Sequence, residues 1–153
     1  RFASIVGTMG ILAFFIGEKL PREKFDPEKF PFKCAKWEKE GKIYDNLGLR
    51  YWKTHVTDMS KYFPRAFSKQ GNFSRDPAHL RRLVQETCSA EAVHWALIAL
   101  SFVFPILMDE LGGLAMVLYI IGNLASIVIQ RYNRPRIMKI TGVIEKRKKC
   151  VNC

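Results

Sequence analysis

The sequence predicts an all-α integral membrane protein with three transmembrane helices. Its apolar residues concentrate in three blocks of the 153-residue chain. Of its 25 lysines and arginines, 16 lie between residues 17 and 85 and eight lie between residues 131 and 153, outside those blocks. Apolar helices separated by basic cytoplasmic segments produce this distribution in membrane proteins. We therefore expect a single membrane domain over residues 1–153.

The first predicted transmembrane helix covers residues 4–20 and contains the apolar run SIVGTMGILAFFI. This run is short, because a membrane span needs roughly 20 residues, and missing N-terminal residues would complete it. A cleaved signal peptide is the alternative interpretation. The sequence has no small-x-small cleavage site before GEKLPREKF, which favours the transmembrane helix.

Residues 21–85 are predicted to form a cytoplasmic interfacial region that is largely helical. The stretch KFDPEKFPFKC carries two prolines and is expected to be irregular. The later stretch YDNLGLRYWKTHVTDMSKYFPRAF alternates aromatic residues with lysines, a combination that the headgroup layer favours. We expect it to form helices on the cytoplasmic membrane face, broken at Pro64.

The second and third transmembrane helices are predicted at residues 88–108 and 114–131. Only the turn DELGG separates their apolar runs, AEAVHWALIALSFVFPILM and LAMVLYIIGNLASIVI. Because this turn has no room for another element, the two spans are expected to form a tight antiparallel hairpin. Residues 132–153 follow as a basic cytoplasmic tail.

The basic residues also predict the orientation. The DELGG turn has no lysine or arginine, so the positive-inside rule places it outside and places residues 21–85 and 132–153 in the cytoplasm. We expect a multi-pass protein of the cell membrane with its N-terminus outside and its C-terminus cytoplasmic. The net charge of +11 suggests an anionic partner, and next to membrane spans a lipid headgroup or a phosphorylated substrate is favoured over nucleic acid.

The cysteines indicate neither a disulfide framework nor a metal site. Cys150 and Cys153 form a lone C-x-x-C at the end of the chain, while Cys34 and Cys88 stand apart from it. Such a pair indicates zinc or redox chemistry only with a second pair or a structured helix start. We therefore expect ordinary reduced thiols, no metal and no bound cofactor.

Two polar stripes run along the predicted hairpin. Residues three and four apart share one face of a helix with about 3.6 residues per turn. Lipid cannot satisfy amides or charges, so these faces are expected to meet protein or water. The stripe of the third span is Tyr119, Asn123, Ser126, Gln130 and Asn133, and that of the second is Thr87, Glu91, His94 and Ser101.

Glu91 and His94 are one turn apart at the cytoplasmic end of their span, and we interpret them as a candidate catalytic pair. Gln130 and Asn133 are expected at the same depth, with Asn123 about 10 Å deeper in the membrane. The two serines of the stripes are more simply explained as groups that hydrogen bond between helices. Two interpretations stay open for Arg131, Arg134 and Arg136: they anchor the helix end at the interface, or they bind a substrate phosphate.

The motifs at these positions resemble a known family. Residues 86–95, ETCSAEAVHW, are similar to a pattern E-T-x-x-A-E-x-x-H-W, and residues 123–136 are similar to N-x-x-x-I-x-x-Q-R-Y-N-R-P-R. Both belong to the glycosyl-4,4'-diaponeurosporenoate acyltransferase family of staphyloxanthin-type carotenoid synthesis. The consecutive run QRYNRP is long and specific. The resemblance covers the C-terminal half of the chain well and the N-terminal half in layout, with YWKTHV similar to an aromatic loop.

This resemblance implies transfer of a fatty acyl group to a hydroxyl of a lipid-soluble, glycosylated acceptor. We expect a thioester donor, acyl-CoA or acyl carrier protein, to arrive from the cytosol. His94 would be the general base, and Glu91 would fix its tautomer. Asn123, Gln130 and Asn133 would position the substrate and its oxyanion.

The remaining assignments follow from the same interpretation. The three arginines would bind the donor phosphates. Two further classes stay open: a membrane transferase of methyl or prenyl groups, and a non-enzymatic membrane adaptor whose polar stripes only lock the hairpin. Contacts with the acceptor at the interface are expected from Trp52, Lys53, Trp95 and Tyr132.

Overall fold

The computed structural model describes residues 2–49, 76–107 and 111–151. These residues form four α-helices and two 3-10 helices and contain no strand, so the described part of the chain is all-α, as predicted. The predicted break at Pro64, with Trp52 and Lys53, lies outside the described residues. The elements are α1 (Phe2–Lys19), η1 (Arg22–Lys24), η2 (Lys36–Leu47), α3 (Pro77–Ser101), α4 (Phe104–Leu107) and α5 (Gly112–Val151).

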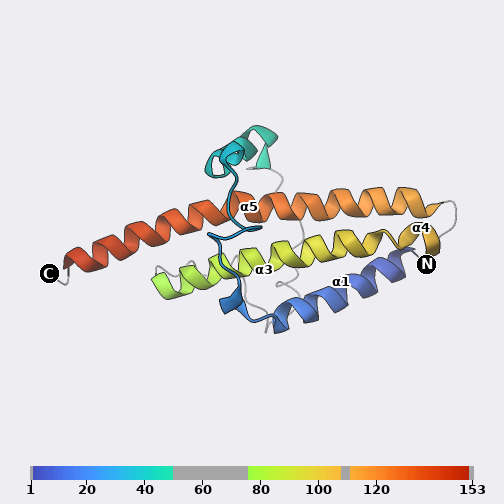
Figure 1. Ribbon diagram of the computed structural model, residues 1–153, viewed down its shortest axis with the longest axis horizontal. Helices are drawn as coiled ribbons and strands as arrows, with labels where there is room; N and C mark the ends of the chain where they lie inside the picture. The colour runs from blue at the N-terminus through green and yellow to red at the C-terminus, as the bar shows by residue number, and fades with distance from the viewer. Residues whose placement is uncertain (1, 50–75, 108–110, 152–153) are drawn as a thin grey trace.

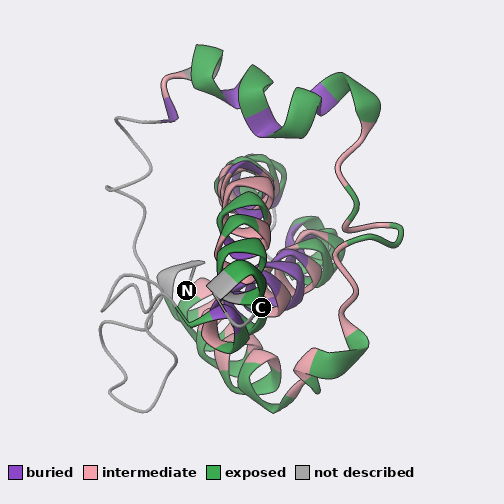
Figure 2. Cartoon of the chain, turned by 90° about the vertical axis from the view of Figure 1, so that its left-hand side faces the viewer, coloured by how far each residue is buried: buried purple, intermediate pink, exposed green. Residues whose placement is uncertain are grey.

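The helices α3 and α5 lie side by side and run in opposite directions, and α1 lies along the other side of α3 (Figure 1). Their buried residues face inward, and the outer surface of the bundle is mostly exposed (Figure 2). The connection between α1 and α3 carries η2, which packs against the middle of α5.

The helix α3 starts earlier than the second predicted span and ends before it. Its first residue is Pro77, a position that suits proline because the first helical N–H has no partner within the helix. It ends at Ser101, four residues before Pro105. A proline lacks an N–H and its ring clashes with the carbonyl four residues earlier, so the helix cannot run straight through. The described part of the predicted span, residues 88–107, therefore forms the second half of α3, a turn at residues 102–103 and the short helix α4.

The third predicted span and the basic tail belong to one helix. The helix α5 is 40 residues long, which corresponds to about 60 Å. Pro135 lies inside it, a residue that commonly bends a helix, and α5 changes direction near its middle in Figure 1. At its start, Gly112 faces the backbone of α4 so closely that a Cβ would lie 2.5 Å from the carbonyl oxygen of Phe104. The turn into α5 therefore needs a glycine at this position.

The exposed apolar residues gather in the half of the bundle that contains α4. Within the described residues, one helix has the length and composition to cross a membrane, namely Gly112–Arg147 of α5. Within its most apolar 18 residues, 22% are buried, so protein covers this helix on one side only. The large apolar side chains that are at least half exposed include Leu12, Phe15 and Ile16 of α1, Phe102, Ile106 and Leu107 after α3, and Leu114, Leu118 and Ile121 of α5.

Candidate functional site

The interface between α3 and α5 changes character along its length. In the half that carries the basic residues, many of its buried side chains are polar and lie beside apolar ones such as Leu80 and Val84, although two packed helices usually bury apolar side chains alone. A buried polar group is costly unless it has a hydrogen-bond partner, so these partners define the site. The buried polar and charged residues are Glu38, Glu86, Thr87, Ser89, Glu91, Ser101, Asn123, Arg134 and Thr141.

Glu91 of α3 lies at the centre of this polar interface and is fully buried. Its Oε1 accepts a hydrogen bond from Nε of Arg131 at 2.8 Å, and its Oε2 accepts one from Nη2 of Arg134 at 2.5 Å. Both arginines come from α5. Nε1 of Trp95 lies 3.5 Å from Oε1 and adds a weaker contact. Glu91 therefore joins α3 to α5 through two charged pairs.

A second buried carboxylate, Glu38 of η2, completes the network. Both of its oxygens lie 3.0 Å from Nη1 of Arg131. The hydroxyl of Tyr44 donates to Oε1 at 2.5 Å, and the backbone N–H of Ala35 donates to Oε2 at 2.5 Å. Nη2 of Arg131 donates to the carbonyl oxygen of Pro31 at 2.6 Å. The irregular segment and η2 are thus tied to α5 at the same point as α3.

Arg134 is almost fully buried, with 1% of its side chain exposed, and its donors are used within the protein. Besides Glu91, it donates from Nε to the hydroxyl of Thr87 at 2.9 Å, from Nη2 to the carbonyl of Thr87 at 3.2 Å, and from Nη1 to the carbonyl of Phe32. Its guanidinium also lies 5.7 Å from the centre of the Phe32 ring. Arg134 of α5 is thus bound both to α3 and to the segment before η2.

The network Glu38–Arg131–Glu91–Arg134 alternates in charge and sums to zero. Its four side chains are exposed by 0, 17, 0 and 1%. Buried ions are tolerated when each has a partner and its remaining donors and acceptors are used, as they are here. We call these four residues the ion-pair network. Because its members come from η2, α3 and α5, it fixes the relative position of those elements.

His94 lies one turn further along α3 and pairs with Asn123 of α5. Its Nδ1 is 2.9 Å from Oδ1 of Asn123. Nδ2 of Asn123 donates to the carbonyl of Tyr119 at 2.9 Å. An amide that uses its NH₂ group on a carbonyl must present its oxygen to the imidazole, so Nδ1 of His94 carries the proton in the neutral ring. Nε2 then holds the lone pair.

The structure brings the predicted catalytic residues into one interface but gives them different partners. Glu91 accepts from the arginines, whereas the ring nitrogen of His94 pairs with Asn123. The orientation of the imidazole, which the sequence analysis assigned to Glu91, is here a property of Asn123. A direct action of Glu91 on His94 stays a prediction.

The three arginines that were predicted to bind a phosphate also have different partners from one another. Arg131 and Arg134 belong to the ion-pair network. Arg136 is partly exposed, stacks 3.5 Å above the ring centre of Tyr132, and pairs with both oxygens of Asp45 at 3.0 and 3.1 Å. Its partner Asp45 is 48% exposed. Arg136 is therefore the member of this set that a soluble ligand reaches most easily.

The other residues of the predicted site are distributed along α5 and α3. Gln130 and Asn133 are half-buried on α5, and Tyr132 is buried there, whereas Trp95 of α3 is 45% exposed. The two serines of the stripes donate to carbonyls of their own helices, Ser101 to Ile98 and Ser126 to Gly122, rather than across the interface. A helical serine has a carbonyl of the preceding turn within reach, and this local bond replaces the expected interhelical one.

Sequence reasoning missed Glu38 and Tyr44. Glu38 stands in the charged run KWEKEGK next to Glu40, which is exposed, and no spacing separates the buried glutamate from the exposed one. Its partner Arg131 is 93 residues away in the chain. The aromatic residues around it were a weak signal: Trp37 and Tyr44 lie at helical spacing and their rings stand edge to face.

The burial of Glu38 and its neighbours shifts the pKa values of three groups around η2. Burial by itself raises the pKa of the Glu38 carboxyl, but hydrogen bonds from Tyr44, Ala35 and Arg131 outweigh it, so the pKa is lowered. Burial and the hydrogen bond to Glu38 raise the pKa of Tyr44. Burial, followed by the Glu38 charge, raises the pKa of the Cys34 thiol. Glu38 therefore stays ionised at neutral pH, and the other two groups keep their protons.

A cavity of about 640 Å³ opens beside the first turns of α3, where α1 and η1 approach it. Arg22 crosses its edge and donates to Oε1 of Glu86 at 2.7 Å and to the carbonyl of Leu20 at 2.7 Å. Its charged lining is balanced, with three glutamates and three arginines, which does not favour an anion over a neutral ligand. The lining residues are Glu18, Leu20, Arg22, Glu23, Ala78, Arg81, Arg82, Gln85 and Glu86.

Comparison with known proteins relates this geometry to one family. The sequence model of the family described as glycosyl-4,4'-diaponeurosporenoate acyltransferase matches residues 22–142, which include the ion-pair network and the His94–Asn123 pair. The curated protein of that name from Staphylococcus aureus strain N315 is 26% identical over 139 residues, covering 86% of this chain and 81% of the relative. Its counterpart from strain MRSA252 is 27% identical with the same coverage. No solved structure matches the chain.

Proposed function

This chain belongs to the glycosyl-4,4'-diaponeurosporenoate acyltransferase family and is an acyltransferase, and from this we propose its substrates, its site and its place in the membrane. We propose that it moves a fatty acyl group from a thioester donor to a hydroxyl of a lipid-soluble, glycosylated acceptor at the cytoplasmic membrane face. The relatives' names give a glycosylated carotenoid acid as their acceptor, and a polyene lipid of this class is the acceptor proposed here.

One observation supports the site above all others. The His94 ring is oriented by an amide that is itself fixed by a backbone carbonyl, which makes Nε2 the unprotonated nitrogen of the neutral ring. A base must be held in the correct tautomer before it can accept a proton from a hydroxyl. The pair also lies where the polar half of the interface meets the apolar half of the bundle, which suits a lipid acceptor.

The reaction proceeds in two steps. Nε2 of His94 accepts the proton of the acceptor hydroxyl while its oxygen attacks the thioester carbonyl carbon, and a tetrahedral oxyanion forms. The C–S bond then breaks, the ester is formed, and the imidazolium returns its proton to the departing thiolate. Asn123 keeps its Oδ1 on the protonated Nδ1 throughout and stabilises the imidazolium.

The ion-pair network contributes structure to this site. Glu91 and Arg134 hold α3 and α5 in the register that brings His94 next to Asn123. Asn123 lies eight residues before Arg131 on α5. Gln130 and Asn133 lie about 10 Å or more along the helix from Asn123, and we propose them as contacts for the donor. Arg136 is the proposed contact for a donor phosphate, which would displace Asp45.

We propose the membrane arrangement on the same footing. The apolar exposed half of the bundle would lie in lipid, with α1, the end of α3 with α4, and the first half of α5 as three spans. The N-terminus would lie outside, and η2 with the second half of α5 would lie in the cytoplasm. Trp95, exposed on α3, is the described aromatic residue best placed to contact the acceptor.

The substitution His94→Gln tests the proposal. It keeps a hydrogen-bonding side chain but removes the proton acceptor, and general-base catalysis is typically worth about 10²–10⁴-fold in rate. The specific activity of monodisperse protein should fall by that order. His79→Gln, on the same helix α3, is the matched control and should stay within a few-fold of the unaltered protein.

The same experiment separates a catalytic His94 from a structural one. If the His94–Asn123 pair only stabilises the helix pair, His94→Gln would lower the yield and melting temperature while the purified protein keeps its specific activity. Activity within a few-fold of the unaltered protein would remove His94 from the mechanism.

A further inference from the structure

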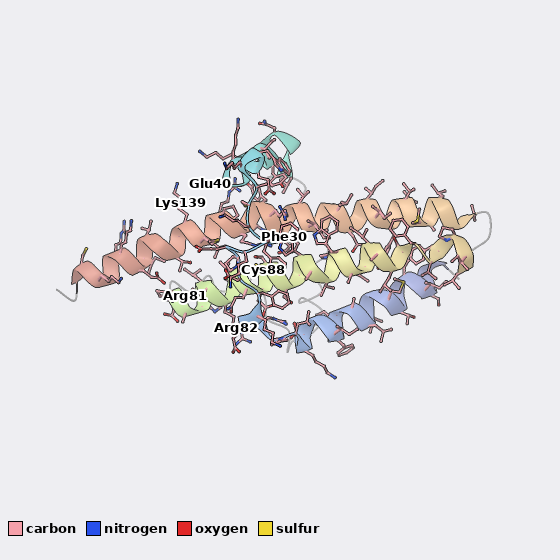
Figure 3. All side chains as sticks on the ribbon, viewed as in Figure 1. Phe30, Glu40, Arg81, Arg82, Cys88 and Lys139 are labelled. Atoms are coloured by element: carbon pink, nitrogen blue, oxygen red, sulfur yellow. The ribbon has the colours of Figure 1, made fainter. Side chains whose placement is uncertain are left out.

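The second half of α5 carries a basic face that the bundle leaves uncovered. Lys139, Lys146 and Arg147 are exposed, and the described residues include no carboxylate partner for any of them. Lys139 points away from α3 in Figure 3. We call these three residues, with the exposed Ile140 and Val143 between them, the basic face.

The helical spacing separates this face from the side of α5 that packs on α3. Arg134 and Thr141 are buried, and Glu145 pairs with Arg81 of α3 at 2.8 Å, so these positions mark the packed side. At about 100° per residue, the three cations of the basic face lie on the opposite side of the helix. They therefore form one continuous surface, about 12 Å long from Lys139 to Arg147.

The distance of the basic face from the end of the membrane span determines whether it contacts lipid headgroups or the cytosol. The apolar part of α5 ends at Arg131 in the proposed arrangement, and Lys146 lies 15 residues further along the helix. That is about 22 Å, whereas the attraction of an anionic bilayer falls off within a Debye length of about 8 Å. The C-terminal end of α5 projects beyond the start of α3 (Figure 1). The outer part of the face therefore meets the cytosol rather than headgroups.

The shape and composition of the face favour a protein over a small anion. A phosphate needs convergent donors, whereas these cations stand on the convex surface of a single helix. Ile140 and Val143 are 40 and 46% exposed among them, and an apolar centre with a charged rim is the usual composition of a protein interface. A partner with complementary charge would be an acidic protein with some apolar surface.

We propose that the basic face docks the acyl donor as a protein, namely a soluble, acidic acyl carrier protein. This inference rests on the proposed function and narrows it, because it selects the carrier protein rather than acyl-CoA as the donor. Lys139, the residue of the basic face nearest the site, is about 24 Å along α5 from Asn123, so the phosphopantetheine arm of the carrier would leave it at this end of the face. The thioester would thus arrive at His94 while the carrier stays in the cytosol.

The test measures binding in the absence of turnover. The whole protein, in nanodiscs of neutral phosphatidylcholine, is titrated with a fluorescently labelled bacterial acyl carrier protein. The triple substitution Lys139→Glu, Lys146→Glu and Arg147→Glu should weaken binding at least tenfold. A second triple substitution, Lys33→Glu, Lys36→Glu and Lys42→Glu, makes the same charge change at exposed lysines elsewhere and should stay within threefold.

Four results would overturn the inference. The first is that the unaltered protein does not bind the carrier, and the second is that both triple substitutions weaken binding equally. The third is binding that raised salt does not weaken. The fourth is that the first triple variant binds the carrier as before but loses its co-purifying phosphatidylglycerol. The last result would assign the face to lipid headgroups.

A turnover measurement with a small soluble acyl thioester separates this inference from the proposed function. The first triple substitution should leave that reaction unchanged, because it lies outside the site. If no thioester supports transfer by the unaltered protein, the proposed function fails, and the binding result still decides the docking. If the small thioester reacts but the carrier protein does not bind, the docking inference fails alone.

Discussion

At the scale of single residues, burial separates the charged groups of this protein into two classes. Glu91 and Arg134 have lost their water and depend on each other, whereas Asp45 and Arg136 keep theirs. The first kind of pair is costly to break, because the partner left behind is a buried charge, and the second kind contributes little. Substitutions of equal chemistry should therefore have unequal effects.

Glu91→Gln tests this difference. It leaves two guanidinium groups facing a neutral amide, and breaking a buried pair in this way typically costs about 3–5 kcal/mol. Asp45→Asn, the matched control at an exposed pair, should cost about 0–1 kcal/mol. Denaturant unfolding in detergent micelles measures both. Equal costs would show that the ion-pair network does not stabilise the helix pair.

Cys34 offers a test of the electrostatics around η2. Burial and the nearby Glu38 charge raise the pKa of its thiol, so less thiolate is present at neutral pH than in a free cysteine. Its rate of alkylation should rise with a midpoint above the usual value of about 8.5. Mass spectrometry of protein pulsed with iodoacetamide at a series of pH values gives this midpoint. A midpoint at or below the usual value would place the thiol in water.

At the scale of elements, the packing of η2 against α5 depends on one glycine. Gly41 has φ of +83° and approaches α5 where the helix contains Pro135. A Cβ at this position would lie 3.3 Å from Cγ of Pro135 and 3.3 Å from the carbonyl oxygen of Tyr132. Both the backbone conformation and the close approach favour glycine.

Gly41→Ala should therefore destabilise the protein by about 1–3 kcal/mol, the usual cost of a strained backbone conformation for other residues. Gly142→Ala is the control, because Gly142 lies inside α5 with open space around it. There alanine should stabilise by about 0.5–1 kcal/mol. Thermal unfolding of the two variants should give changes of opposite sign, and a neutral Gly41→Ala would show that η2 is not held against α5.

The same element predicts a dependence on pH. The pKa of Glu38 is lowered in the folded protein, so its contribution to stability is complete above the unfolded value of about 4.3 and is lost as the pH falls through the lower folded value. The denaturant midpoint should fall in that acidic range and stay flat in Glu38→Gln. A parallel fall in both proteins would assign the effect to other carboxylates.

At the scale of the whole molecule, the bundle has an apolar half and a charged half, and the boundary between the two halves lies near His94 and Asn123. The arrangement suits an enzyme that meets one substrate in lipid and another in water. In the proposed topology, the positive-inside rule places the charged half in the cytoplasm.

Labelling of the native cysteines tests this orientation. Cys34 precedes η2 and Cys150 lies near the end of α5, and both belong to the charged half. In intact cells an impermeant maleimide should leave both unlabelled, and permeabilisation should expose Cys150 at once. Labelling of Cys150 from outside a sealed membrane would reverse the proposed topology.

The helices and the polar stripes could be predicted from the sequence, because apolar blocks and the spacing of side chains along a helix are local properties. The positions of Glu91, His94 and Asn123 on facing stripes follow from that spacing alone. The boundaries were less accurate where a proline decided them, at Pro105, and where the basic tail continued α5 without interruption.

The pairing of the polar groups could not be predicted in this way, because it depends on how the helices and η2 pack in space. Glu91 and His94 share a face, but the long guanidinium groups of Arg131 and Arg134 reach across from α5 and take both oxygens of the carboxylate. Glu38 joins them from 93 residues away. A buried charge selects the strongest opposite charge within reach in space, and distance along the chain does not reveal that choice.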